Sequence, residues 1–204
     1  MARIDLARRA EIGREKRART RAQIVEAGAA LLADRPPEAL TVDAIVEAAG
    51  IAKGTFYYHF KNIEELAGAV GEQLGESLDE LLAPARLSLP DPIARISFAF
   101  SRFLAKSIED PHWARLVLQS TQATTEPARG VREHLKADLT EAKAQGRLRI
   151  DDIELAADIV VGIYLQVTRG ILHRGAAPDL VDQALAAVLR AVGASPPRNA
   201  TKTR

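Results

Sequence analysis

The short segment between Lys53 and Lys61 gathers side chains that can contact a nucleic acid. Its sequence, KGTFYYHFK, supplies ammonium, hydroxyl, phenol and imidazole groups, which donate hydrogen bonds to phosphate oxygens. The tyrosine rings and the threonine methyl add flat or apolar surface for base edges. A surface that binds only phosphates would need mostly Lys and Arg. The mixture therefore favours a segment that reads the major groove of DNA.

Two short helices joined by a glycine turn are expected to position these groups. Thr41 is placed to cap the first helix, in which apolar residues follow at helical spacing. Gly50 permits a sharp left-handed turn before the second helix. Phe56 and Phe60 are four residues apart and are expected on the buried side, which leaves the polar residues on the other side.

The two tyrosines of this segment admit a second interpretation. Tyr57 and Tyr58 are also compatible with ordinary half-buried packing residues. The order of the signals favours the DNA-reading interpretation, because a capped helix, a glycine turn and a polar aromatic helix follow one another within the length of a helix-turn-helix.

The stretch TVDAIVEAAGIAKGTFYYHFK, residues 41–61, resembles the DNA-binding signature of the TetR family of bacterial repressors. The likeness is strong over about Thr20 to Leu66 and fades beyond. It implies an operator of double-stranded DNA. By the same resemblance, the residues that hold phosphates are Thr41, Tyr57 and Lys61, and the residues that approach bases or backbone are Lys53, Gly54, Thr55, Tyr58 and His59.

The segment departs from the family pattern at three places. Ala52 stands where members often have a Ser that caps the recognition helix, and Ile63 stands where many carry a phosphate-binding Lys. Loss of a cap typically costs about 0.5–2 kcal/mol. A loop with Arg35-Pro36-Pro37 replaces a commoner glycine-containing turn, away from the proposed contacts.

Composition excludes several classes of protein. The 204 residues are 47% hydrophobic and include no Cys, which excludes disulfides and thiol chemistry. The N-terminal residues lack the apolar stretch of a secretion signal. No apolar run approaches the roughly 18 residues of a membrane span, since Asp158 and Gln166 interrupt the best candidate. A cytoplasmic protein without a membrane partner is expected.

Charge is unevenly distributed along the chain. The net charge is +1, but residues 1–21 carry eight Lys or Arg against three acidic residues, and residues 194–204 add three more cations, which leaves −7 for the remainder. A basic arm at residues 1–18 is expected to neutralise phosphates without reading sequence. The alternative is a disordered solubilising tail. Residues 194–204 are interpreted as a flexible tail.

Helical patterning extends through the whole chain and predicts an all-α fold. Ala and Leu dominate, and no segment shows sustained period-two alternation of β-branched residues. Acid-proline pairs and glycines mark helix ends. The expected helices, besides the two short ones, run from about Arg19 to Asp34, from Asn62 to just before Pro84, from Asp91-Pro92, from Asp110-Pro111, from Glu126-Pro127 to near Gly146, from a capping box of Asp151 and Glu154 to His173 or Arg174 before Gly175, and from Pro178 to Gly193.

These helices predict a modular chain. After the basic arm, residues 19–66 form a three-helix DNA-binding domain with the helix-turn-helix, and a helix of roughly 30 Å joins it to a second helical domain at residues 67–193. That second domain is expected to bind an effector and to mediate dimerisation.

Residues 152–192 are expected to form the interface of a homodimer. Their two helices are the most apolar pair, and Gly162 and Gly170 let backbones approach. A second copy of the pair would make a four-helix interface. The alternative is burial within one subunit. Two-fold symmetry suits a palindromic operator with half-sites about 34–36 Å apart, or a multiple of that distance.

The resemblance also implies a cavity for an unknown small-molecule effector. Aromatic and amide side chains on three of the expected helices are the candidates for its lining. Plain core packing is the alternative for each ring. The candidates are Phe100, Phe103, Trp113, Gln119, Gln122 and Tyr164.

Catalytic signatures are missing from the sequence. It has no phosphate loop, no HExxH and no G-x-S-x-G elbow. Glu109 and His112 match half of a helical di-iron site, but Pro111 breaks the helix and no second pair exists. No cofactor, metal or enzymatic activity is expected. Besides a regulator, the sequence admits a helical architectural protein that coats DNA without sequence preference.

Overall fold

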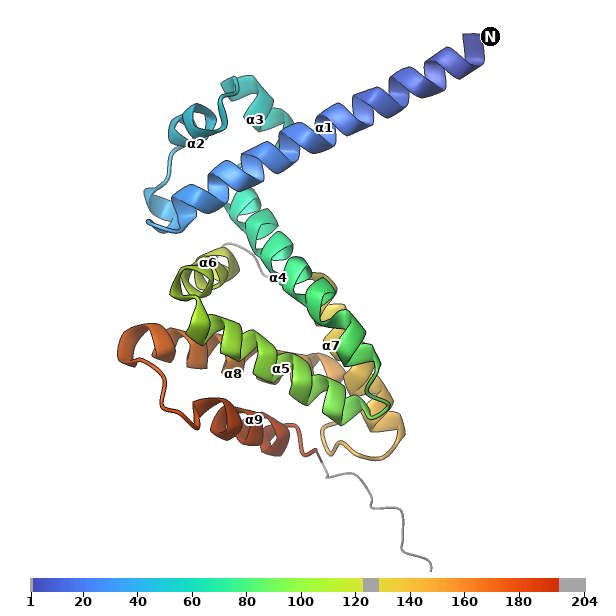
Figure 1. The fold of residues 1–204 in the computed structure, drawn as a ribbon, viewed down its shortest axis with the longest axis vertical. Helices are drawn as coiled ribbons and strands as arrows, with labels where there is room; N and C mark the ends of the chain where they lie inside the picture. Colours follow the sequence, from blue (N-terminus) through green and yellow to red (C-terminus); the bar gives the residue numbers. More distant parts are fainter. Residues whose placement is uncertain (1, 123–128, 195–204) are drawn as a thin grey trace, which may run out of the picture. The chain divides into compact units, whose positions relative to one another are not determined.

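The computed structural model describes residues 2–122 and 129–194, and within these ranges the chain is helical with no strand (Figure 1). The predicted all-α class is confirmed. Besides the short 3₁₀ helix Pro37–Ala39, the helices are α1 Ala2–Leu32, α2 Val42–Ala49, α3 Lys53–His59, α4 Ile63–Leu87, α5 Pro92–Glu109, α6 Pro111–Gln122, α7 Arg129–Ala144, α8 Ile153–Arg174 and α9 Leu180–Ala191.

The chain divides into two compact units. The first holds residues 1–71 and 119–127, and the second holds residues 72–118 and 128–204. The division therefore falls inside α4, directly after Gly71, and again inside α6.

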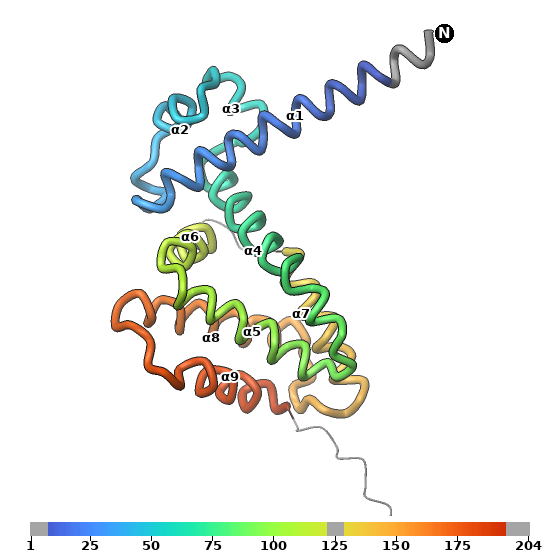
Figure 2. Tube along the Cα trace, viewed as in Figure 1, coloured from blue at the N-terminus to red at the C-terminus, as the bar shows by residue number. Residues whose placement is uncertain are grey.

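The first unit packs α2 and α3 around α1 and the beginning of α4 (Figures 1 and 2). Gly28 of α1 lies so close to Leu66 of α4 that an added Cβ would come within 2.8 Å of the leucine methyl group. The side chain of Gln23 donates to the Ala49 carbonyl oxygen at 2.6 Å, which satisfies the C-terminal end of α2. The fully buried side chains of this core include Ile24, Leu32, Ile45, Phe56 and Leu66.

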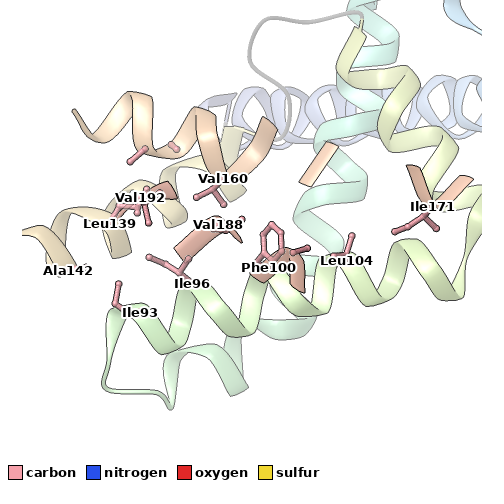
Figure 3. Close-up of a cluster of buried hydrophobic side chains, with 13 residues drawn as sticks. Ile93, Ile96, Phe100, Leu104, Leu139, Ala142, Val160, Ile171, Val188 and Val192 are labelled. Atoms are coloured by element: carbon pink, nitrogen blue, oxygen red, sulfur yellow. The ribbon is translucent and has the colours of Figure 1, made fainter. Parts of the chain in front are cut away.

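The second unit is built around α5, which contacts α7, α8 and α9. Asp91 caps α5 by accepting from the Ile93 N–H at 3.0 Å, and Pro92 occupies the first helical position, as the acid-proline pair predicted. The apolar face of α5 lies over side chains from three other helices (Figure 3). This cluster includes Ile93, Ile96, Phe100, Leu104, Leu139, Ala142, Val160, Ile171, Val188 and Val192.

The predicted starts of two helices are wrong. The first helix begins at Ala2 instead of near Arg19. Residues 2–18 are rich in Ala, Arg and Glu, which favour the helix, and Glu15 precedes Arg19 by the four residues that suit an ion pair on a helix surface. The cap of α8 is Asp152, not Asp151, and it accepts from the N–H groups of Glu154 and Leu155.

The end of α4 also differs from the prediction, because the helix continues through Pro84 to Leu87. Proline cannot donate to the preceding turn, and this normally ends a helix. Here buried contacts hold the last turn. The Arg86 guanidinium lies 3.1 Å from Asp138 of α7 and 3.9 Å from Asp79, and all three side chains are buried. A lone buried charge would be costly, so these pairs fix the turn in place.

Other predicted starts and stops are confirmed, within the usual one or two residues. α6 begins at Pro111, α7 is followed by Gly146 with φ +68°, α8 ends before Gly175, and α9 spans most of the last predicted range. The start predicted at Glu126-Pro127 lies outside the described residues.

Among the described helices, α8 is long and apolar enough to cross a membrane by length and composition alone. Asp158 and Gln166 interrupt its apolar run, as expected, but the helix as a whole still passes this test. One such helix is weak support for a membrane span, since core helices pass the same test. Only 33% of its most apolar window is buried within the subunit, so α8 keeps an uncovered surface.

Candidate nucleic-acid interface and ligand region

The turn between α2 and α3 has the geometry that the sequence predicted. The Thr41 hydroxyl accepts from the Ala44 N–H at 3.2 Å and caps α2. Gly50 ends α2 in the left-handed region, with φ +63° and ψ +37°. Its conformation lets the Ile51 N–H return to the Val46 carbonyl at 3.0 Å, which closes the turn.

Two phenylalanines orient α3. Phe56 and Phe60 are 0% and 2% exposed, and their ring centroids lie 6.0 Å apart. Because they anchor one side of the helix, the side chains between them are directed outward. Tyr57 and Tyr58 are 54% and 67% exposed, so the half-buried packing interpretation does not hold for them.

The other residues assigned to DNA surround these tyrosines. Lys53, Gly54 and Lys61 are exposed, while Thr55 and His59 are half-buried. The Lys53 ammonium lies 2.8 Å from Asp43 of α2, and this hydrogen bond raises the pKa of Lys53. This exposed ion pair links the beginning of α3 to α2.

His59 is expected to be neutral at pH 7. Burial lowers its pKa from the ordinary value of 6.5, and the nearby Arg21 guanidinium lowers it further. A neutral imidazole offers one donor and one acceptor. His59 therefore supplies hydrogen-bonding capacity to the surface rather than charge.

The sequence analysis missed two features that support this surface. Asn62 accepts from the Glu65 N–H at 2.9 Å while the Glu65 carboxylate accepts from the Lys61 N–H at 2.7 Å, a reciprocal cap at the start of α4. The spacing of Asn62 and Glu65 could have revealed it. The Arg21 guanidinium lies 5.1 Å from the centroid of the Phe60 ring, and no sequence signal predicts this contact.

Ala52 occupies the N-cap of α3 and makes no side-chain cap hydrogen bond. We expect Ala52→Ser to raise the free energy of unfolding by about 0.5–2 kcal/mol, because the new hydroxyl can accept from an unpaired N–H of the first turn. Urea denaturation followed by circular dichroism measures the change. The matched control is Ala48→Ser in the last turn of α2, at an exposed position where serine does not cap a helix start; equal effects at both positions would refute the capping explanation.

Comparison with known families places both units. Residues 24–70 match the family model described as bacterial regulatory proteins of the tetR family. Residues 91–201, more than half of the chain, match the model described as tetracyclin repressor-like, C-terminal domain. The chain belongs to the TetR family.

Solved structures agree with this assignment. The structure of RolR with its ligand resorcinol is similar at 29% identity with a TM-score of 0.71, and the match covers 89% of this chain and 91% of that one. FadR from Bacillus subtilis, in complex with stearoyl-CoA, is 20% identical with a TM-score of 0.64. The match covers 85% of this chain and 99% of FadR. SmeT, the repressor of the Stenotrophomonas maltophilia efflux pump SmeDEF, is 23% identical with a TM-score of 0.62. The match covers 84% of this chain and 89% of SmeT.

This TetR-family chain brings together three of the six residues assigned to a ligand. The Phe103 ring centroid lies 6.2 Å from both Trp113 and Tyr164, so α5, α6 and α8 each contribute one ring. Phe100 belongs to the apolar cluster of Figure 3. Gln119 lies in the other compact unit, and its amide oxygen is buried without a hydrogen-bond partner. The Gln122 side chain lies outside the described residues.

Two hydroxyl residues in this region were missed. Ser107 and Thr168 are both 0% exposed. The Ser107 hydroxyl lies 3.1 Å from the Tyr164 phenol oxygen, and the Thr168 hydroxyl donates to Ser107 at 3.4 Å. These residues are about 60 positions apart in the chain, so sequence spacing carries no sign of their contact.

Stability at high pH is expected to depend on Tyr164. Burial raises its pKa from 10.0 to about 12. The phenol therefore ionises first in the unfolded chain. The contribution of Tyr164 to the free energy of unfolding is complete below pH 10 and declines between pH 10 and about 12, by about 1.4 kcal/mol for each pH unit. Tyr164→Phe should remove much of this decline while it lowers stability at pH 7 by about 0.5–1.5 kcal/mol through the lost hydrogen bond. Denaturation between pH 7 and 12 tests this, and identical slopes for both proteins would contradict it.

Proposed function

We propose that this protein is a transcriptional repressor that binds a palindromic operator as a homodimer and leaves it when a small molecule binds. The observation that carries the proposal is the exposed polar side of α3, held outward by the buried Phe56 and Phe60. Family membership supplies the context of DNA binding. We infer a cytoplasmic location for such a regulator.

Contacts with the operator are assigned to the side chains around Tyr57 and Tyr58. Their phenols and rings suit phosphate oxygens and base edges of a major groove. Thr41, Tyr57 and Lys61 are proposed to hold phosphates. Lys53, Gly54, Thr55, Tyr58 and His59 are proposed to approach bases or the sugar-phosphate backbone.

The basic part of α1 is proposed to contact phosphates beside the half-site. Arg14, Arg17 and Arg21 are exposed and follow at spacings of three and four residues, which places them on one face of the helix. Arg21, the last of the three, lies over the ring of Phe60 directly after α3. Charge on a continuous helix would add affinity that falls as salt rises.

The homodimer is proposed to form through residues 152–192. Leu155 is 49% exposed on α8, although it is an apolar side chain. Gly162 is exposed, and a Cβ added there would meet nothing within 4 Å in the same subunit. An uncovered apolar helix with a small residue at its centre suits a close helix-helix approach.

Release by a small molecule is supported by the relatives. RolR was solved with resorcinol, and the match to this chain is 29% identical over nearly all of both chains. We propose that this chain likewise binds a small effector in its second unit, next to Phe103. Effector binding would favour a conformation with lower DNA affinity.

Footprinting of genomic DNA with the purified full-length protein tests the function. The expected result is protection of a two-fold symmetric site upstream of a gene, and reduced transcription of that gene in vitro when the protein is added. Equal affinity for every duplex with a steep salt dependence would instead identify an architectural DNA-coating protein. Increased transcription would refute repression.

A further inference from the structure

The hydroxyl groups of Ser107, Tyr164 and Thr168 form a polar cluster inside the second unit. Ser107 and Thr168 are completely buried. The three oxygens are linked through Ser107, at 3.1 Å from Tyr164 and 3.4 Å from Thr168. Burial of hydroxyl groups is unfavourable unless they are hydrogen-bonded, and these three groups satisfy that condition through one another.

The cluster is rich in acceptors. Each hydroxyl offers one proton and two lone pairs. The Ser107 hydroxyl donates its proton to the Phe103 carbonyl oxygen at 3.1 Å. Thr168 donates to Ser107, and the Tyr164 hydroxyl bonds with Ser107 and Thr168, so all three protons are engaged while lone pairs on Tyr164 and Thr168 remain. The chemistry that complements this cluster is therefore a hydrogen-bond donor.

Aromatic rings border the cluster. Phe103 stands edge-on to Tyr164, with an interplanar angle of 89°, and is tilted by 56° from Trp113. Phe103 is only half-buried, so the middle ring of the three is not sealed within the core. Rings that meet at such angles provide both edges and faces to a further aromatic ring.

Charge narrows the class of compound further. Tyr164 stays neutral in this environment, because burial is the main cause of its raised pKa and no charged group is among the causes. An anionic compound would lose its hydration on entering this buried region, at a large desolvation cost. A neutral compound avoids that cost.

We propose that the cluster of Ser107, Tyr164 and Thr168 recognises a small, neutral, hydroxylated aromatic compound. The compound donates its hydroxyl proton to the Tyr164 or Thr168 oxygen, and its ring packs on Phe103. This inference rests on the proposed function, because it names the chemical class of the effector.

Titration calorimetry on the full-length protein without DNA tests the proposal. The probes are phenol and resorcinol, with toluene as the ring without a hydroxyl, cyclohexanol as the hydroxyl without an aromatic ring, and benzoate as the anion. Phenol or resorcinol is expected to bind at least about tenfold more tightly than the other three, as the loss of one hydrogen bond implies. Equal affinity for toluene, tighter binding of benzoate, or no binding of either phenol at millimolar concentration would overturn the proposal.

Isosteric variants locate the site. Tyr164→Phe and Thr168→Val each remove a hydroxyl with little change of shape. The variant that loses the acceptor is expected to weaken phenol binding about tenfold while toluene is unaffected. The matched control is Ser97→Ala, whose hydroxyl on α5 donates only within its own helix, to the Ile93 carbonyl. Unfolding temperatures confirm that each variant is folded. Unchanged phenol affinity in both folded variants would refute the assignment.

The proposed function has a separate readout. Phenol binding that leaves operator affinity unchanged would refute release by an effector, and the assignment of the cluster would stand. Release of DNA by a compound of another class, without any binding of phenols, would refute the cluster and preserve the function.

Discussion

Replacement of both Tyr57 and Lys61 by alanine is expected to weaken operator binding by about 10²–10³-fold without a loss of folding. Both side chains are exposed in the free protein, so their removal leaves the core residues in place, although Tyr57 loses its edge contact with the Phe56 ring. A dimer carries two copies of each, which makes four phosphate contacts at about 1 kcal/mol each. The loss should be nearly the same for the operator and for unrelated DNA, because phosphates carry no sequence information.

Salt dependence gives this prediction a second measurement. Each phosphate that loses a lysine partner lowers the slope of log affinity against log salt by about 0.9, and the neutral Tyr57 does not contribute to this slope. The double variant should therefore lose about 2 from the slope per dimer, one contribution from each Lys61. Fluorescence anisotropy with a labelled operator at several salt concentrations provides both values. Arg102→Ala, which removes an exposed cation from α5 in the other unit, is the matched control. Wild-type affinity in the double variant would show that α3 does not hold the DNA.

The DNA-binding unit was predictable because its signals are local. Thr41 and the N–H that it caps are three residues apart, Gly50 is itself the turn, and Phe56 and Phe60 are one helical turn apart. Each of these features acts over a distance that a single helix spans. The sequence therefore predicted both the elements and the side of α3 that faces outward.

The second unit was less predictable because its polar contacts join distant segments. Arg86 meets Asp138 from 52 residues away, and Ser107 meets Tyr164 from 57 residues away. The first pair offsets the effect of Pro84 on α4, and the local rule that proline ends a helix therefore failed. Aromatic candidates were recognised by residue type, but the hydroxyl cluster emerged only from the packing of α5 against α8.

Gly162→Arg is expected to convert the proposed dimer into a folded monomer. Within the subunit, a Cβ at this position meets nothing within 4 Å, so the new side chain has room in the monomer. Replacement of a helical glycine by arginine also favours the helix by roughly 0.8–1 kcal/mol. A large cation at the proposed helix-helix contact would prevent the close approach of a second α8. Folding and assembly are thereby separated in one variant.

Loss of the dimer removes the second reader from the operator. A linked second binding event typically contributes 10²- to 10⁴-fold to overall affinity, so operator binding by Gly162→Arg should fall by about that factor. Light scattering and equilibrium sedimentation measure the mass, and thermal unfolding verifies the fold. The control is Ala137→Arg, which places the same side chain on an exposed position of α7. A Gly162→Arg protein that remains dimeric at low micromolar concentration would exclude the central part of α8 from the interface, and the uncovered face of that helix would then need another partner.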